Sequence, residues 1–177
     1  MKLVRTKLSG SYIVELEKIE DDRGFFARTW CEEVFLKKGL ISKIVQANLS
    51  YNHKAGTLRG MHYQRSPHGE VKIVRCIRGA IFDVIVDLRP DSKTYLKWFG
   101  TELSAENYKS LYIPVNFAHG FQTLTDDAEI FYLVSQYYHP ESSTGLRYDD
   151  PAIGISWPLG VTEISGKDSS WPDIMTP

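Results

Sequence analysis

Residues 72–88 read KIVRCIRGAIFDVIVDL, and this run is the best guide to the fold class. Its apolar side chains are dense and largely β-branched, a composition typical of short β-strands. Arg78-Gly79 interrupts the run near its middle. We therefore predict two strands, 72–77 and 80–88, that pair as a hairpin.

The second strand has polar side chains on one of its faces. Asp83 and Asp87 fall on the same face, because alternate residues of a strand point the same way. Along residues 128–136, Tyr132 likewise shares a face with Ile130. Inward faces that carry Asp or Tyr at intervals suit a barrel with a polar lumen.

Segments of the same character recur on both sides of this run. They are residues 11–16, 44–51, 98–103, 109–113, 120–125 and 128–136. The best helix candidate is 31–38, since Gly39 follows it in the position of a C-cap. The segment from Pro158 onward is expected to wrap the outside. Many short strands and few helices predict one all-β domain over residues 1–177, a sandwich or barrel.

The composition excludes several classes of function. Among 177 residues, 21 Lys and Arg stand against 22 Asp and Glu, which gives a net charge of −1. Nucleic-acid and membrane-surface proteins normally show a basic excess, and no apolar run approaches the ~20 residues of a membrane span. Cys31 and Cys76 have no metal-ligand spacing and are too few for a disulfide framework. We expect a cytoplasmic protein without nucleic-acid or membrane partners.

The stretch Leu58-Arg59-Gly60-Met61-His62-Tyr63-Gln64 holds the first candidates for chemistry. It is expected to bring Arg59, His62 and Gln64 close to Lys72 on an adjacent strand. A lone histidine in a strand is more often structural than functional. Three polar neighbours make His62 a candidate for a functional group.

Four other residues are ambiguous when taken singly. His119 lies among small and apolar residues, and Tyr132 is in a run that could fill a core. Asp168 is typical of a loop or helix N-cap, and Arg23 of a turn. Each of these residues, taken alone, is more often structural. Whether they are functional therefore has to be judged from the order of all the motifs along the chain.

The order of the motifs along the chain resembles that of the dTDP-4-dehydrorhamnose 3,5-epimerase family over nearly the whole chain. The matching segments are DRGFF (22–26), LRGMHYQ (58–64), FDVIVDLR (82–89), LSAEN (103–107), FAHGF (117–121), Tyr132, DDPAIGI (149–155) with Trp157-Pro158, and SGKD (165–168). The resemblance implies a cupin-type antiparallel β-barrel, or jelly roll, with a few short helices. It also implies a homodimer that uses no cofactor and no metal. The implied reaction is epimerisation of a nucleoside-diphosphate-linked 4-keto-6-deoxyhexose at C3, C5 or both, in rhamnose-type deoxysugar biosynthesis.

The resemblance also implies a role for each matching position. His62 corresponds to the general base, Asp168 to the carboxylate that orients it, and Tyr132 to the acid on the opposite face of the sugar. Lys72 corresponds to the cation near the keto oxygen. The expected substrate-binding residues are Arg23, Phe26, Gln46, Asn48, Arg59, His119 and Tyr138, with His119 paired to Asp83.

These residue types suit proton abstraction beside a ketone. The carbanion formed there is an enolate, so a base on one face is needed, worth ~10²–10⁴-fold. A donor at the developing oxyanion is worth ~2.7–4 kcal/mol. Inversion then needs a proton from the other face, which a phenol supplies.

Alternatives remain open at this stage. Residues 27–35 and 65–71 differ from the form typical of rhamnose-pathway members, which leaves a single-carbon epimerase of CDP- or GDP-linked sugars as an alternative. A metal-dependent cupin enzyme would have donors in His62, His68, Glu70 and His119, but His62-Tyr63-Gln64 lacks the alternating histidine pair of such sites. A non-catalytic sugar-nucleotide-binding protein and a ketoisomerase are further alternatives.

Overall fold

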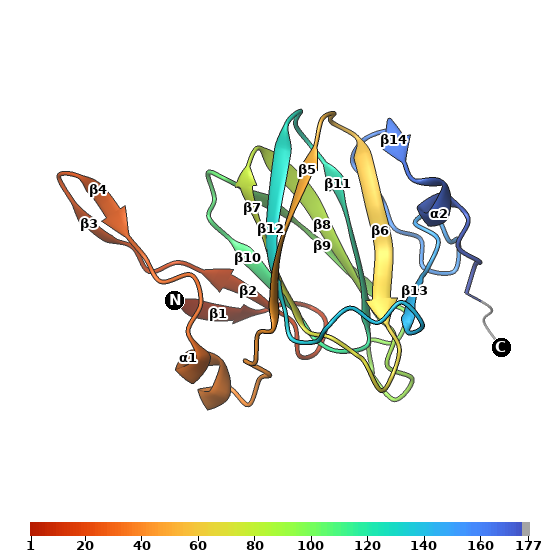
Figure 1. The fold of residues 1–177 in the computed structure, drawn as a ribbon, viewed down its shortest axis with the longest axis horizontal. Coiled ribbons are helices and arrows are strands. Elements are labelled where there is room, and N and C mark those ends of the chain that lie inside the picture. Colours follow the sequence, from red (N-terminus) through yellow and green to blue (C-terminus); the bar gives the residue numbers. More distant parts are fainter. Residues whose placement is uncertain (175–177) are drawn as a thin grey trace.

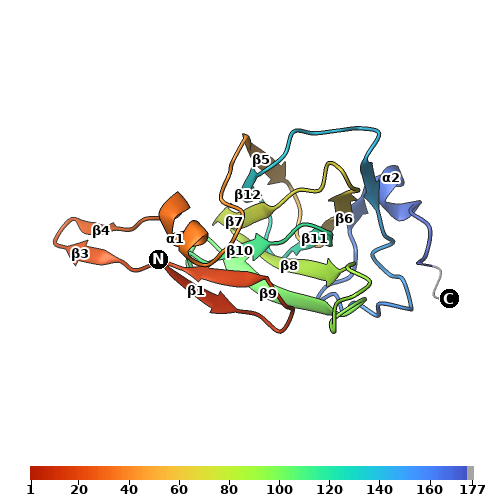
Figure 2. The same ribbon diagram turned by 90° about the horizontal axis from the view of Figure 1, so that it is seen from below.

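The computed structural model describes residues 1–174 and confirms an antiparallel, cupin-type β-barrel. One main sheet has the order β1-β2-β10-β7-β12-β5, and the other has the order β13-β6-β11-β8-β9 with β14 beside β6. Figures 1 and 2 show the two sheets facing each other and a separate hairpin, β3–β4, projecting from one end.

The strands of the first sheet are β1 (Lys2–Arg5), β2 (Tyr12–Glu15), β10 (Ser110–Ile113), β7 (Lys72–Arg78), β12 (Ala128–Val134) and β5 (Gln46–Asn52). Those of the second are β13 (Ser143–Gly145), β6 (Thr57–Gln64), β11 (Phe117–Thr123), β8 (Ala80–Asp87), β9 (Trp98–Ser104) and β14 (Glu163–Ile164). The projecting hairpin consists of β3 (Ile19–Asp21) and β4 (Gly24–Phe26).

The predicted hairpin between residues 72–77 and 80–88 is wrong. Both strands form where expected, but β7 pairs with β10 and β12, whereas β8 pairs with β11 and β9. The chain instead turns a corner from one sheet into the other at Gly79, whose φ is +70°. A Cβ there would come within 2.3 Å of the Thr125 hydroxyl, so the corner requires glycine.

The side chains between the sheets form the main core. It combines Val74, Leu111 and Ile130 of the first sheet with Ile81 and Ile85 of the second, all nearly or fully buried. Full burial of side chains of this size contributes about 1.5–3 kcal/mol each. This packing fixes the distance between the two sheets, and with it the width of the space between them.

The other face of β8 is also covered. Val84 and Val86 pack there against Leu146, Ile153 and Trp157 from the C-terminal part of the chain. The wrapping segment therefore begins before Pro158, where we had placed its start. It then returns to the barrel, because β14 pairs in parallel with β6.

The helix predicted for residues 31–38 is confirmed as α1 (Glu32–Lys37). Gly39 follows it with φ +69°, and its N–H donates to the carbonyl of Leu36. A second helix, α2 (Gly166–Ser169), is N-capped by Ser165, whose hydroxyl accepts a hydrogen bond from the N–H of Asp168. Neither of these described helices has the length and apolar character of a membrane span.

Candidate active site

A cavity between the two sheets brings together the residues expected to carry chemistry. His62 of β6, Lys72 of β7, His119 of β11 and Tyr132 of β12 all line a space of about 210 Å³. Lys72 was expected on a strand adjacent to His62, but β6 and β7 belong to opposite sheets. The two side chains meet across the barrel instead, which gives the cavity functional groups on both of its walls.

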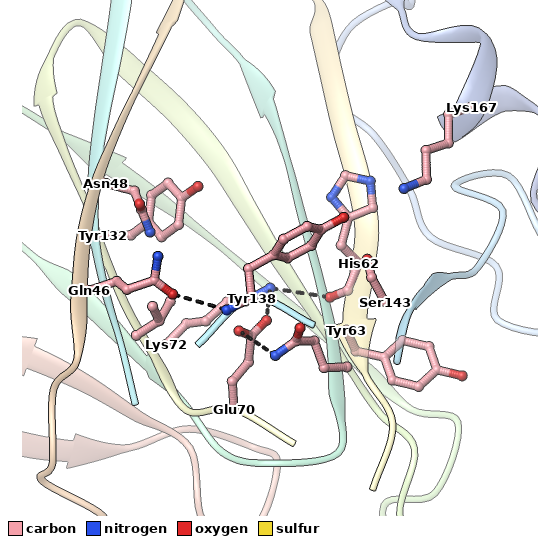
Figure 3. A pocket seen from close by; sticks show the side chains of 12 residues that line it. Gln46, Asn48, His62, Tyr63, Glu70, Lys72, Tyr132, Tyr138, Ser143 and Lys167 are labelled. Carbon is pink, nitrogen blue, oxygen red and sulfur yellow. Dashed lines mark hydrogen bonds and ion pairs between the residues drawn. The ribbon is translucent and has the colours of Figure 1, made fainter. Parts of the chain in front are cut away.

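The cavity continues outward into a mouth of about 320 Å³. His62, Lys72 and Tyr132 line both spaces, and the mouth adds Gln46, Asn48, Tyr63, Gln64, Glu70, Val134, Tyr138, Ser143 and Lys167. Figure 3 shows Tyr132, Asn48 and Gln46 on one wall and His62 on the other. A ligand in the mouth therefore lies between a histidine and a phenol.

His62 and Asp168 form a hydrogen-bonded pair, with Nε2 2.6 Å from Oδ1. The other oxygen of Asp168 accepts a hydrogen bond of 3.1 Å from the N–H of Gly60. Burial favours the neutral carboxyl, but the hydrogen bonds from His62 and Gly60 outweigh it and hold the pKa of Asp168 below its usual value. Because Nε2 is engaged, Nδ1 is the nitrogen of His62 left free to accept a proton.

Two glycines allow the strands behind His62 to approach closely. Gly60 has φ +135°, and a Cβ on it would lie 2.5 Å from the Cα of Gly120 on β11. A Cβ on Gly120 would in turn lie 2.7 Å from the carbonyl of Arg59. The sequence Arg59-Gly60-Met61-His62 is thus held directly against β11, next to the α2 turn that carries Asp168.

Lys72 is held on the floor of the mouth by two oxygens. Its Nζ lies 3.0 Å from a carboxylate oxygen of Glu70 and 3.5 Å from the carbonyl of His62. The Lys72 and Glu70 side chains are only 12% and 14% exposed. The ammonium therefore lies at the boundary of the cavity and is largely shielded from bulk water.

Tyr132 lies half-buried on the opposite wall from His62. Burial, and after it the charge of Glu70, raises the pKa of Tyr132, although Arg59 acts against the shift. A phenol of this kind stays protonated at neutral pH. It can donate a proton to whatever occupies the cavity.

His119 forms the second histidine–carboxylate pair, as expected. Its Nε2 is 2.7 Å from the fully buried Asp83. Arg59 lines the cavity beside it and is fixed by a 2.6 Å hydrogen bond to Asn52. His119 and Arg59 thus add polar groups to a cavity that Phe121 and Ile130 also line.

The remaining predicted binding residues divide into two groups. Gln46, Asn48 and Tyr138 line the mouth, and the Gln46 amide oxygen accepts a hydrogen bond from the N–H of Tyr138. Arg23 and Phe26 lie on the β3–β4 hairpin, exposed to solvent and away from the cavity of their own chain (Figure 1).

Sequence reasoning gave two charged residues of the mouth no part in this site: Lys167 was not singled out, and Glu70 was named only as a possible metal donor. Each had a usable signal. Glu70 precedes Lys72 by two positions, the spacing that places side chains on the same side of an extended chain. Lys167 is the neighbour of Asp168, and it lines both the mouth and a second space beside Arg59.

The donors considered for a metal-dependent enzyme do not gather at one point. Within residues 1–174, the only cluster of three potential metal ligands is His68, His139 and Glu141. The two imidazole rings stack, with centroids 3.5 Å apart and planes inclined by 9°. The nitrogen lone pairs, which lie in the two ring planes, therefore point along parallel planes and do not converge. The rings would have to turn before both could bind one ion.

Comparison with known proteins agrees with this geometry. A profile of the dTDP-4-dehydrorhamnose 3,5-epimerase family matches residues 5–176. The curated dTDP-4-dehydrorhamnose 3,5-epimerase of Methanothermobacter thermautotrophicus is 46% identical over 177 residues, 98% of this chain and 94% of its own.

Solved structures extend the agreement to three dimensions. The enzyme of the same name from Elizabethkingia anophelis superposes with a TM-score of 0.95 at 39% identity, over 98% of this chain and 96% of that one. A Legionella pneumophila epimerase solved in complex with dTDP-4-keto-L-rhamnose superposes with a TM-score of 0.89 at 38% identity, over 96% of this chain and 90% of that one. The chain therefore belongs to the dTDP-4-dehydrorhamnose 3,5-epimerase family.

Proposed function

We propose that this protein is an isomerase that epimerises a dTDP-linked 4-keto-6-deoxyhexose at C3 and C5, in rhamnose-type deoxysugar biosynthesis. The observation that carries the proposal is the arrangement of three groups around one cavity. The His62–Asp168 pair lies on one wall, Tyr132 on the other, and Lys72 lies between them. Family membership and the dTDP-4-keto-L-rhamnose bound to the Legionella relative support this substrate class.

The first step is proton abstraction by His62. Nδ1 accepts the proton from a carbon next to the ketone, and the C–H electron pair moves onto the keto oxygen as an enolate. The ring becomes an imidazolium, and the ionised Asp168 at Nε2 stabilises that charge. Lys72 donates to the enolate oxygen, where the negative charge develops.

The second step is protonation from the opposite face by Tyr132. The phenol O–H gives its proton to the carbon, the enolate electrons form the new C–H bond, and the ketone is restored. Solvent then reprotonates the phenolate and takes the proton from His62. The carbon is inverted without a net change of oxidation state, so the reaction requires no redox cofactor.

Polar side chains of the mouth and of the space beside Arg59 fit the nucleotide end of the substrate. Arg59 and Lys167 both line the space next to His62, and two cations there suit a diphosphate. Gln46, Asn48 and Tyr138 offer amide and phenol groups at the outer rim, and His119 closes the inner end around the sugar.

We also propose that the protein works as a cytoplasmic homodimer with one epimerase domain per chain. One face of the β3–β4 hairpin is anchored to the barrel, because Phe25 packs edge-to-face on Tyr108 at 5.0 Å and Lys18 lies over both rings. The opposite face, on which Ile19 pairs with Phe26, exposes these two side chains by 70% and 65%. Exposed apolar side chains on an anchored, projecting hairpin suit a contact with a second copy of the chain. The cavity of that copy would then receive Arg23 and Phe26.

The test is product analysis with a panel of 4-keto sugar nucleotides. Purified protein is incubated with dTDP-4-keto-6-deoxy-D-glucose and with its CDP- and GDP-linked counterparts, and products are identified by NMR. We expect dTDP-4-keto-L-rhamnose from the dTDP sugar, with slower turnover of the other two. A product with a displaced carbonyl would identify a ketoisomerase, and binding without turnover would identify a binding protein.

A further inference from the structure

Glu70 is a charged residue of the mouth that has no role in the reaction steps outlined above. It lies two residues before Lys72, in the loop that leads from β6 into β7, and its carboxylate is 3.0 Å from the Lys72 ammonium. Both side chains are almost buried. An ion pair removed from water is costly unless its partners are well fixed, so the neighbours of Glu70 decide what the pair does.

The fold fixes the position of Glu70. The two N–H groups of the Gln64 amide are shared among three acceptors: the carbonyl of His68 at 3.0 Å, the carbonyl of Tyr137 at 3.1 Å and the second carboxylate oxygen of Glu70 at 3.3 Å. The Gln64 amide oxygen accepts from the N–H of His139 at 2.7 Å. Gln64 thus ties together the loops on both sides of the mouth and holds Glu70 between them.

The same contacts fix the Lys72 ammonium. An ammonium has three N–H groups. Within the described residues, Lys72 Nζ contacts one oxygen of Glu70 and, more weakly, the carbonyl of His62. At least one N–H remains for a ligand in the cavity that Lys72 lines.

We propose that Glu70 is a positioning residue that anchors Lys72, so that its remaining N–H meets the keto oxygen of the substrate. This inference rests on the proposed function, which places Lys72 at that oxygen. A free lysine side chain has many rotamers and would have to be ordered as the enolate forms. A donor that is already in place stabilises the oxyanion without that reorganisation.

Glu70 has a second consequence on the opposite wall. Its charge is the second contribution, after burial, to the raised pKa of Tyr132. Removing the charge lowers the pKa of Tyr132 toward its usual value, so the loss of activity at alkaline pH should begin at a lower pH. This shift reports the charge of Glu70 at Tyr132, separately from the anchoring of Lys72.

The experiment compares kcat, KM and the pH profile of wild type with those of Glu70→Gln, which keeps the shape and removes the charge. Loss of a charge-assisted hydrogen bond predicts kcat about 10- to 100-fold lower, with KM within about threefold. The matched control is Glu33→Gln, which breaks an exposed pair with Lys37 and should behave as wild type.

A double-mutant cycle tests whether Glu70 acts through Lys72. At pH 7.5, where Tyr132 is protonated, Glu70→Gln should cost less than about twofold once Lys72→Met is present. The proposal is overturned if Glu70→Gln leaves kcat unchanged or raises it. It is equally overturned if the two losses multiply in the double variant.

A measurement without substrate separates this inference from the proposed function. ¹³C relaxation of the lysine Cε groups, with Lys72 assigned through Lys72→Met, should find Lys72 rigid in wild type and mobile in Glu70→Gln. Equal mobility in both proteins overturns the anchoring, whatever the activity. Rigid Lys72 in a wild type that turns over no 4-keto sugar nucleotide upholds the anchoring and refutes the proposed function instead.

Discussion

Replacing Asp168 by Asn tests how the carboxylate assists His62. The substitution keeps the size of the side chain and removes its charge. The N–H of Gly60 donates to Oδ2 of Asp168, so the amide oxygen of Asn should take that place. Its NH₂ group then faces Nε2 of His62 and donates to it. This forces the ring hydrogen onto Nδ1, the nitrogen that has to accept the substrate proton.

The size of the effect follows from two losses. A charge-assisted hydrogen bond such as the 2.6 Å contact between His62 and Asp168 contributes about 1.5–3 kcal/mol, which corresponds to roughly 10- to 150-fold in rate. The unfavourable tautomer adds to this, and the same substitution in a serine-protease triad costs about 10⁴-fold. We therefore expect the exchange rate of Asp168→Asn to fall by about 10²- to 10⁴-fold.

The assay is incorporation of deuterium from D₂O into the dTDP-linked 4-keto sugar, followed by NMR. Asp168→Asn should lie between wild type and His62→Ala, because the base is still present. Asp149→Asn is the matched control, since the Asp149 side chain is 41% exposed and, among residues 1–174, pairs only with Arg147. An exchange rate of Asp168→Asn within threefold of wild type would refute the reasoning, provided that thermal denaturation shows both proteins folded.

Three further predictions follow from the structure. Tyr132→Phe should reduce product formation by about 10²–10⁴-fold but exchange far less, because His62 can return solvent deuterium to the same face; equal losses in the NMR assay would mean shared roles. Asp87 is buried, which opposes its ionisation, but hydrogen bonds led by those from Arg89 lower its pKa to about 2. Ionised Asp87 should therefore contribute about 2 kcal/mol to the free energy of unfolding above about pH 4, and this contribution is lost as the pH falls toward 2. Urea unfolding should accordingly show Asp87→Asn destabilised at pH 7 and much less destabilised near pH 2. Finally, Arg23→Ala and His62→Ala subunits, each inactive alone, should regain about a quarter of wild-type activity when unfolded and refolded together, if the β3–β4 hairpin of each copy serves the other copy's cavity; no regain would contradict that arrangement.

The strands were predictable from the sequence, but their partners were not. Alternation and β-branched residues located residues 72–78 and 80–87 almost to the residue. Periodicity says which face a side chain occupies, yet both faces of β8 are buried, so the pattern carries no information about its neighbours. The one-residue corner at Gly79 resembles a tight turn in sequence and changes sheets in space.

The candidate site was predictable only where the family resemblance reached it. His62 and Asp168 are 106 positions apart, and their contact depends on the C-terminal segment returning beside β6. The local sequence pattern around either residue carries no information about such a contact. Glu70 was considered only as a metal donor although its spacing from Lys72 was visible, because a carboxylate near a lysine is ordinary in a surface loop. The roles of Arg23 and Phe26 remain predictions, since they concern a second copy of the chain.

The most direct test of the central claim is deuterium incorporation by wild type and His62→Ala under the same conditions. Each protein is incubated in D₂O with dTDP-4-keto-6-deoxy-D-glucose, and C3 and C5 are followed separately by NMR. Proton abstraction by His62 predicts deuterium at both carbons with wild type and none above the uncatalysed rate with His62→Ala. Exchange that persists in a folded His62→Ala protein would contradict the account.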